Sequence, residues 1–150
     1  MSKNLEGKTA LITGASKGVG EAIAELLGSY KMKIGLMARS TEKLDNVAKK
    51  IQQAGGQALV LTTDLKSQHE IENALAKIKQ EYGFVDILIN SAGIGHRGFW
   101  NDLSLETDLE TFSVNYHAPV ILIRHLLPKM LTDNKGQIIK RLEPREKGNI

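Results

Sequence analysis

The sequence contains no cysteine, only three prolines, few aromatic residues and no long apolar run. Without cysteine, the chain forms no disulfide bond, thiolate metal site or cysteine nucleophile. The longest aliphatic run, 120–123, is far too short to cross a bilayer, and the first eight residues lack the apolar core of a secretory signal. These features predict a soluble, cytoplasmic protein with no membrane association and no metal site.

An excess of charge of one sign is also absent, because the formal net charge is only +3. The last eleven residues hold four cations and two acids, which leaves the rest of the chain near +1. Elsewhere, basic and acidic residues alternate along the predicted helices, a pattern typical of a solvated surface. We therefore expect no nucleic-acid partner.

Short apolar runs alternate with stretches of helical spacing along the 150 residues, a length typical of one domain. The runs indicate strands buried on both faces. Such an alternation predicts an α/β fold of βαβ units, in which a doubly wound parallel sheet carries helices on both faces. The predicted strands contain 10–12, 34–37, 58–61, 87–89 and 136–139, and the helical patterns cover 23–30, 44–51 and 71–82.

A longer helix is predicted over 106–131, with apolar residues at steps of three or four and with bends expected at Pro119 and Pro128. If nothing covers this helix, its apolar stripe from Phe112 to Met130 is exposed, and the strand at 136–139 has an unpaired edge. We therefore predict marginal stability or self-association.

The first strand ends in a glycine-rich loop, Thr13-Gly14-Ala15-Ser16-Lys17-Gly18-Val19-Gly20, that opens the first helix. This context is typical of a dinucleotide site, in which glycines allow a tight turn, close approach of the pyrophosphate and close helix packing. An ordinary glycine-rich turn is less favoured, because strand, loop and helix coincide. The loop lacks the Gly-Lys-Ser/Thr ending of a P-loop, which argues against an NTPase. The residues expected at the cofactor are Gly14, Ser16, Lys17, Gly18, Val19 and Gly20.

The second predicted strand ends in Arg39-Ser40, where an NAD-selective site would place a carboxylate for the ribose hydroxyl. A guanidinium there can pair with a 2′-phosphate, and Lys17 can add a second positive charge. These residues favour NADP(H) over NAD(H). A methyltransferase is disfavoured, because it commonly needs an acidic residue at this position.

With these residues in place, the sequence resembles the short-chain dehydrogenase/reductase family of the common, shorter type. Asp64-Leu65 matches the family's adenine-contacting pair, and 90–93 resembles its N-N-A-G segment with Ser in second place. Asn115 matches the Asn that holds a water in the family's proton relay. The resemblance implies a Rossmann-like sheet, incomplete at about five strands in the order 3-2-1-4-5, and hydride transfer between NADP(H) and a carbonyl or alcohol. It adds Asp64, Leu65, Asn90, Ala92 and Gly93 to the expected cofactor site.

The family also uses a Ser and a Tyr-x-x-x-Lys, which should follow Asn115. No serine follows Asn115, and Tyr116 has Val120 in place of the lysine. From Lys140 onward the sequence departs from the family, so we expect a truncated chain with an NADP(H)-binding domain at 1–139 and a charged tail at 140–150. Only Asn115 of the catalytic set is retained, which predicts an inactive protein. The alternative is a non-catalytic NADP(H)-binding or regulatory fragment that pairs with a partner, such as a full-length relative.

Overall fold

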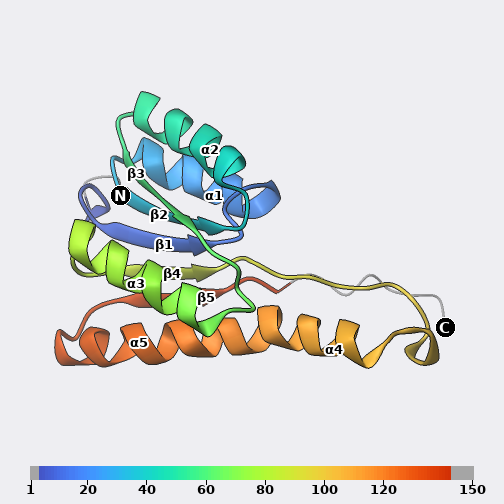
Figure 1. Ribbon diagram of the computed structural model, residues 1–150. Helices are drawn as coiled ribbons and strands as arrows, with labels where there is room; N and C mark the ends of the chain where they lie inside the picture. Colours follow the sequence, from blue (N-terminus) through green and yellow to red (C-terminus); the bar gives the residue numbers. More distant parts are fainter. Residues whose placement is uncertain (1–3, 143–150) are drawn as a thin grey trace.

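Five parallel strands form one sheet in the order β3-β2-β1-β4-β5 in the computed structural model, which describes residues 4–142 (Figure 1). The predicted α/β fold and its strand order are therefore confirmed. Each predicted apolar run lies in a strand, although the observed strands begin or end one residue away from most predicted limits. The strands are β1 (Thr9–Thr13), β2 (Lys33–Ala38), β3 (Gln57–Thr62), β4 (Ile87–Asn90) and β5 (Gln137–Lys140).

Helices cover both faces of the sheet (Figure 1). Along β1, Ala10 and Ile12 pack into the core beneath α1 (Gly18–Ser29) and α2 (Thr41–Gln53), whereas Leu11 packs into the core on the opposite face. That second core includes residues of α3 (Gln68–Tyr82) and α5 (Ala118–Thr132). Since successive side chains of a strand point to opposite faces, a continuous apolar run serves both cores.

Serine side chains begin three of the helices. Ser40, Ser67 and Ser104 each accept a hydrogen bond from the backbone N–H three residues later, and so cap α2, α3 and α4 (Leu105–Phe112). The first helix differs, because Lys17 stands at its N-cap position without a capping side-chain bond. The first turn of α1 is therefore left without a side-chain acceptor of its own.

The long helix predicted over 106–131 is helical throughout, but it is not a single α-helix. A π-helical segment, Ser113–His117, separates α4 from α5, although the two helices run on roughly in line (Figure 1). The π segment ends two residues before Pro119, which is in the first turn of α5, and Pro128 lies inside α5.

The α4–α5 unit exposes a row of large apolar side chains, as predicted, but Met130 is not among them. Met130 is only 5% exposed and lies against Gly136, whereas Phe112 is 51% exposed. β5 is mostly exposed, and its residue Ile139 is 44% exposed. The strand continues through Lys140, the first residue of the predicted charged tail; residues 143–150 of that tail lie outside the described residues.

Candidate functional site

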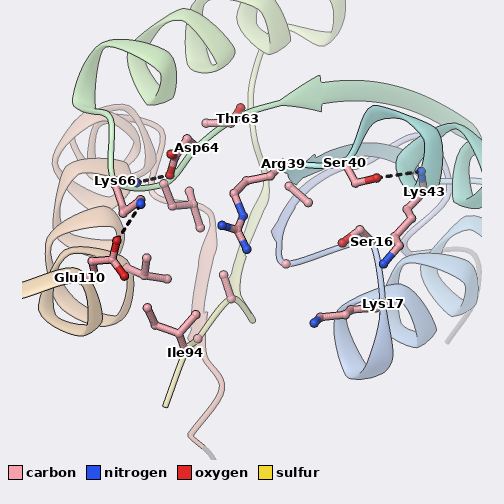
Figure 2. Close-up of a pocket in the computed structure, with 16 residues that line it drawn as sticks. Ser16, Lys17, Arg39, Ser40, Lys43, Thr63, Asp64, Lys66, Ile94 and Glu110 are labelled. Atoms are coloured by element: carbon pink, nitrogen blue, oxygen red, sulfur yellow. Dashed lines mark hydrogen bonds and ion pairs between the residues drawn. The ribbon is translucent and has the colours of Figure 1, made fainter. Parts of the chain in front are cut away.

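A cleft of about 500 Å³ lies at the carboxyl ends of the central strands, where open parallel sheets commonly bind ligands (Figure 2). The loop after β1, the ends of β2 and β3, the segment after β4 and the α4–π unit all contribute to it. The lining residues are Gly14, Ser16, Lys17, Ala38, Arg39, Ser40, Lys43, Thr63, Asp64, Leu65, Lys66, Ala92, Gly93, Ile94, Glu110 and Val114.

The glycines of the loop after β1 leave room that a side chain would fill. Gly14 has a φ of +67°, and a Cβ on it would lie 2.8 Å from the Cα of Ala92. Gly18 has a φ of +59° and no atom of another segment within 4 Å of the Cβ position. The amide of Gly14 donates to the carbonyl oxygen of Met37 at 2.9 Å, which holds the loop against β2. The loop is thus an open cradle at the start of α1, with a shape that fits a pyrophosphate.

Three cationic side chains reach into this cleft from three segments of the chain. Lys17 comes from the loop, Arg39 from the end of β2 and Lys43 from the first turn of α2 (Figure 2). Their side-chain nitrogens make no hydrogen bond or ion pair within residues 4–142. The hydroxyl of Ser40 is already used as an acceptor, since it caps α2 through the amide of Lys43 at 3.4 Å. The unpaired positive charges suit an anionic group such as a phosphate monoester.

The opposite wall of the cleft is the loop after β3. Thr63 and Leu65 are buried, and the Thr63 hydroxyl donates to the carbonyl oxygen of Leu61. Asp64 accepts a hydrogen bond at Oδ1 from the amide of Lys66 at 2.9 Å, so one carboxylate oxygen is engaged within the loop. The wall therefore presents Leu65 in a fixed position, with Asp64 beside it.

The segment after β4 is tied to both of its neighbouring strands. Thr13 Oγ1 accepts from the amide of Ala92 at 3.0 Å, and the carbonyl oxygen of Asn90 accepts from the amide of Arg141 at 3.0 Å. The side chain of Asn90 is 1% exposed, yet its amide nitrogen and oxygen have no partner in the described part of the chain. At the end of β5, Lys140 Nζ donates to the carbonyl oxygen of Ala92 at 3.4 Å. Burial and, to a lesser degree, the nearby charge of Arg141 lower the pKa of Lys140.

Asn115 lies in the π segment and binds the backbone of Ile94 with both side-chain atoms. Its Oδ1 accepts from the Ile94 amide at 2.9 Å, and its Nδ2 donates to the Ile94 carbonyl oxygen at 2.7 Å. Asn115 does not line the cleft, whereas Ile94 does. The side chain of Asn115 therefore fixes the backbone of Ile94, a residue that lines the cleft.

The structure brings together nine of the thirteen residues predicted at the cofactor. The other four lie behind or beside the cleft: Gly20 and Asn90 are buried, and Gly18 and Val19 are exposed at the start of α1. Sequence reasoning missed Lys43, which lies in the first turn of α2, three residues after the N-cap Ser40. It also missed Ala38, Thr63, Lys66, Ile94, Glu110 and Val114.

Residues 4–142 contain no group of three or more His, Cys, Asp or Glu side chains placed to hold a metal ion. None of the helices in this range has the length and apolar character needed to cross a membrane.

Comparison with solved structures places the same architecture beside nicotinamide nucleotides in other proteins. A metagenomic short-chain oxidoreductase in complex with NADP superposes with a TM-score of 0.91 at 34% identity, over 100% of this chain and 66% of that chain. L-Sorbose reductase from Gluconobacter frateurii, complexed with NADPH and L-sorbose, gives a TM-score of 0.85 at 30% identity, over 90% of this chain and 52% of that one.

Curated relatives match along nearly the whole chain. A fatty acyl-CoA reductase of Acinetobacter baylyi is 38% identical over 139 residues, which are 91% of this chain and 47% of the relative. The chain spans about half the length of the curated relatives that it matches. The family model of the short chain dehydrogenases matches residues 8–141. On the fold, the glycine loop and this match, the chain belongs to the short-chain dehydrogenase/reductase family.

Proposed function

We propose that the chain binds NADP(H) in preference to NAD(H). The observation that carries this proposal is the set of three cations around the cleft beside the glycine loop, Lys17, Arg39 and Lys43, which have no side-chain partner within residues 4–142. The acidic groups of the cleft, Asp64 and Glu110, both accept hydrogen bonds from Lys66 instead. An additional phosphate would thus meet uncompensated positive charge, whereas the ribose hydroxyl of NAD(H) would find no carboxylate at the end of β2.

Each part of the cleft has a distinct role in this proposal. The amides and glycines of 14–20 hold the pyrophosphate, and the three cations hold the 2′-phosphate. Leu65 and Asp64 receive the adenine, and the segment 90–93 lies along the ribose. Asn115 acts through Ile94, whose backbone it clamps. When bound, the nucleotide would give hydride to a carbonyl or take it from an alcohol.

We further propose that the 150-residue chain binds the nucleotide but does not turn over a carbonyl substrate. Reduction requires a proton donor for the developing alkoxide. No serine follows Ser113, and no tyrosine is followed four positions later by lysine. Oxidation of NADPH by the purified chain in the presence of simple ketones and aldehydes would contradict this part of the proposal.

Calorimetric titration with NADPH and NADH tests the cofactor assignment. Hydrogen bonds to charged groups contribute about 1.5–3 kcal/mol, so Arg39→Asp should weaken NADPH binding by roughly 10- to 150-fold. The same change should weaken NADH binding much less, because NADH has no 2′-phosphate. Arg124→Asp is the matched control: this exposed arginine of α5 lies outside the cleft, and its replacement should change neither affinity.

Two outcomes would refute the assignment. Wild-type chain that does not bind NADPH would remove the proposed function itself. Equal losses for NADPH and NADH in Arg39→Asp would leave nucleotide binding in place but would show that Arg39 does not read the 2′-phosphate.

A second candidate function is binding of a protein partner, and we propose a second copy of this chain as the simplest one. The exposed row on α4, the π segment and α5 includes two aromatic rings, Phe112 and Tyr116, stacked 4.9 Å apart. Large apolar surfaces of this kind commonly mark interaction sites. Sedimentation velocity should show a concentration-dependent dimer that Leu109→Glu abolishes; a monomer at all concentrations would refute self-association. The row consists of Leu105, Leu109, Phe112, Tyr116, Leu127 and Leu131.

A further inference from the structure

Lys66 and Glu110 join two separate elements at one end of the cleft. Lys66 Nζ lies 3.0 Å from Glu110 Oε1, and both residues line the cleft (Figure 2). Lys66 comes from the loop between β3 and α3, and Glu110 comes from α4, 44 positions later. The hydrogen bond to Glu110 raises the pKa of Lys66. The contact therefore ties α4 to the sheet side of the cleft.

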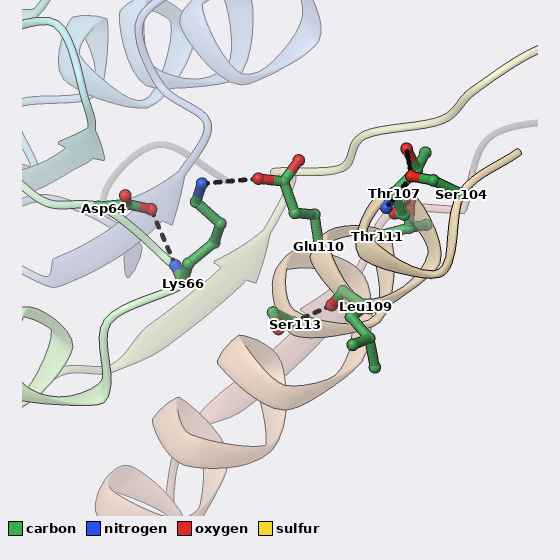
Figure 3. A network of polar contacts seen from close by, with 8 residues as sticks. All are labelled: Asp64, Lys66, Ser104, Thr107, Leu109, Glu110, Thr111 and Ser113. Carbon is green, nitrogen blue, oxygen red and sulfur yellow. Dashed lines mark hydrogen bonds and ion pairs between the residues drawn. The ribbon is translucent and has the colours of Figure 1, made fainter.

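The loop that carries Lys66 is held by three further bonds. Asp64 Oδ1 accepts from the Lys66 amide at 2.9 Å (Figure 3). The Asp64 amide donates to Glu70 Oε2, also at 2.9 Å. The carbonyl oxygen of Asp64 accepts from the amide of Ser67, also at 2.9 Å. Because both ends of this short segment are bonded, a displacement of Lys66 should also displace its neighbour Leu65.

The helix that carries Glu110 is also internally braced, but it is not held by burial. Ser104 caps its first turn through the amide of Thr107, and Thr111 and Ser113 donate to carbonyl oxygens four residues earlier (Figure 3). None of the residues of α4 is buried. The Lys66–Glu110 bond joins this exposed helix to the loop after β3.

We infer that Lys66 and Glu110 are positioning residues for the bound nucleotide, because their ion pair sets the separation of the two apolar side chains at this end of the cleft. Those side chains are Leu65, next to Lys66, and Val114, one helical turn after Glu110. The unpaired cations Lys17 and Lys43 lie on the other side of Arg39 (Figure 2). The phosphates belong to that cationic end, which leaves the slot between Leu65 and Val114 for the planar base. This inference rests on the proposed nucleotide binding.

The variant Glu110→Gln distinguishes positioning from a purely electrostatic effect of the ion pair, because the two predict opposite changes in affinity. If the pair acted only through charge, Glu110→Gln would free an ammonium group beside an anionic ligand and tighten binding. If the pair acts by positioning, Glu110→Gln and Lys66→Gln both loosen the slot and both weaken binding. An exposed ion pair is worth up to about 1 kcal/mol, so the dissociation constant of NADPH should rise about two- to fivefold in each variant.

The experiment is calorimetric titration of the full chain with NADPH. The double variant Lys66→Gln/Glu110→Gln should bind no more weakly than the weaker single variant, and the charge swap Lys66→Glu/Glu110→Lys should return to within about twofold of wild type. Lys129→Gln is the matched control, because it removes a 2.9 Å ion pair with Asp133 at the far end of α5. That control should leave the affinity unchanged.

Two ligands that each contain part of NADPH distinguish a loss of positioning from a general loss of structure. Adenosine 2′,5′-bisphosphate, which contains the base, should lose the same factor as NADPH, and nicotinamide mononucleotide should lose none. Tighter binding by Glu110→Gln, equal losses for both ligands or no rescue by the swap would each overturn the inference. Failure of wild-type chain to bind NADPH would instead overturn the proposed function.

Discussion

A single methyl group added at Gly20 should both destabilise the protein and close the dinucleotide loop. A Cβ at this position would lie 2.2 Å from the carbonyl oxygen of Gly14 and 2.8 Å from its carbonyl carbon. Non-bonded carbon atoms prefer about 3.5–4.0 Å, so the two backbone segments must separate by about 1 Å. Gly14 has no space to retreat, because its own Cβ position is blocked by Ala92 and its amide is bonded to Met37.

The expected cost lies at the upper end of the range for overpacking, about 3 kcal/mol, out of a total stability of about 5–15 kcal/mol. With a urea dependence of about 1.5–3 kcal/mol per molar, the unfolding midpoint of Gly20→Ala should fall by roughly 1–2 M. Circular dichroism at increasing urea concentration measures this shift, and calorimetry should show that NADPH binding is lost.

Gly18→Ala provides the comparison, because it separates backbone conformation from crowding. Gly18 has a positive φ but open space around it, so alanine there should cost only about 1 kcal/mol. Gly20 lies in helix α1 without a positive φ, and conformational entropy alone predicts that alanine there stabilises the protein. An unfolding midpoint for Gly20→Ala at or above that of wild type would show that the crowding argument is wrong.

Three further predictions concern stability away from the loop. The hydrogen bond from Lys50 lowers the pKa of Glu21 below its ordinary value of 4.5. The stabilisation from this bond is therefore complete above pH 4.5 and is lost as the pH falls through the lower pKa of the folded state. Between roughly pH 5 and pH 3, Glu21→Gln should lose less stability than wild type in urea titrations. Asn90→Leu should keep or raise the melting temperature, because each buried, unpartnered polar group costs about 1–3 kcal/mol, and a clear fall would indicate a partner for the amide. Ser67→Ala should cost about 1 kcal/mol by removing the cap of α3, and Ser67→Asp should restore it; equal urea midpoints for both variants would contradict the capping role.

The sheet was predictable because its strands are buried on both faces. Runs such as Ala10–Ile12 place side chains in both cores, and this leaves a continuous apolar signal that turns and helices interrupt. The same pattern could not reveal the π segment, because apolar residues continue at steps of three or four through Ser113–His117. The contact of Asn115 with Ile94, 21 positions earlier in the chain, emerges only when the chain is folded.

The candidate site was predictable where its residues belong to one local motif. Gly14, Lys17 and Arg39 follow directly from the ends of the first two strands. Lys66 and Glu110 did not, because isolated charged residues on a loop and on a helix look like ordinary surface positions in a sequence. Their significance depends on the distance between two elements, which tertiary packing sets.

The place of β1 in the middle of the sheet has a consequence for synthesis on the ribosome. Ala10 pairs with Ile34 on one side, but on the other side it pairs with Ile87, 77 positions later. At about 5–20 residues per second, roughly 4–15 s pass between the emergence of Ala10 and that of Ile87. During that interval β1, whose five residues are all buried in the folded protein, has one edge without its native neighbour, which makes this the stage at which chaperone binding should matter most.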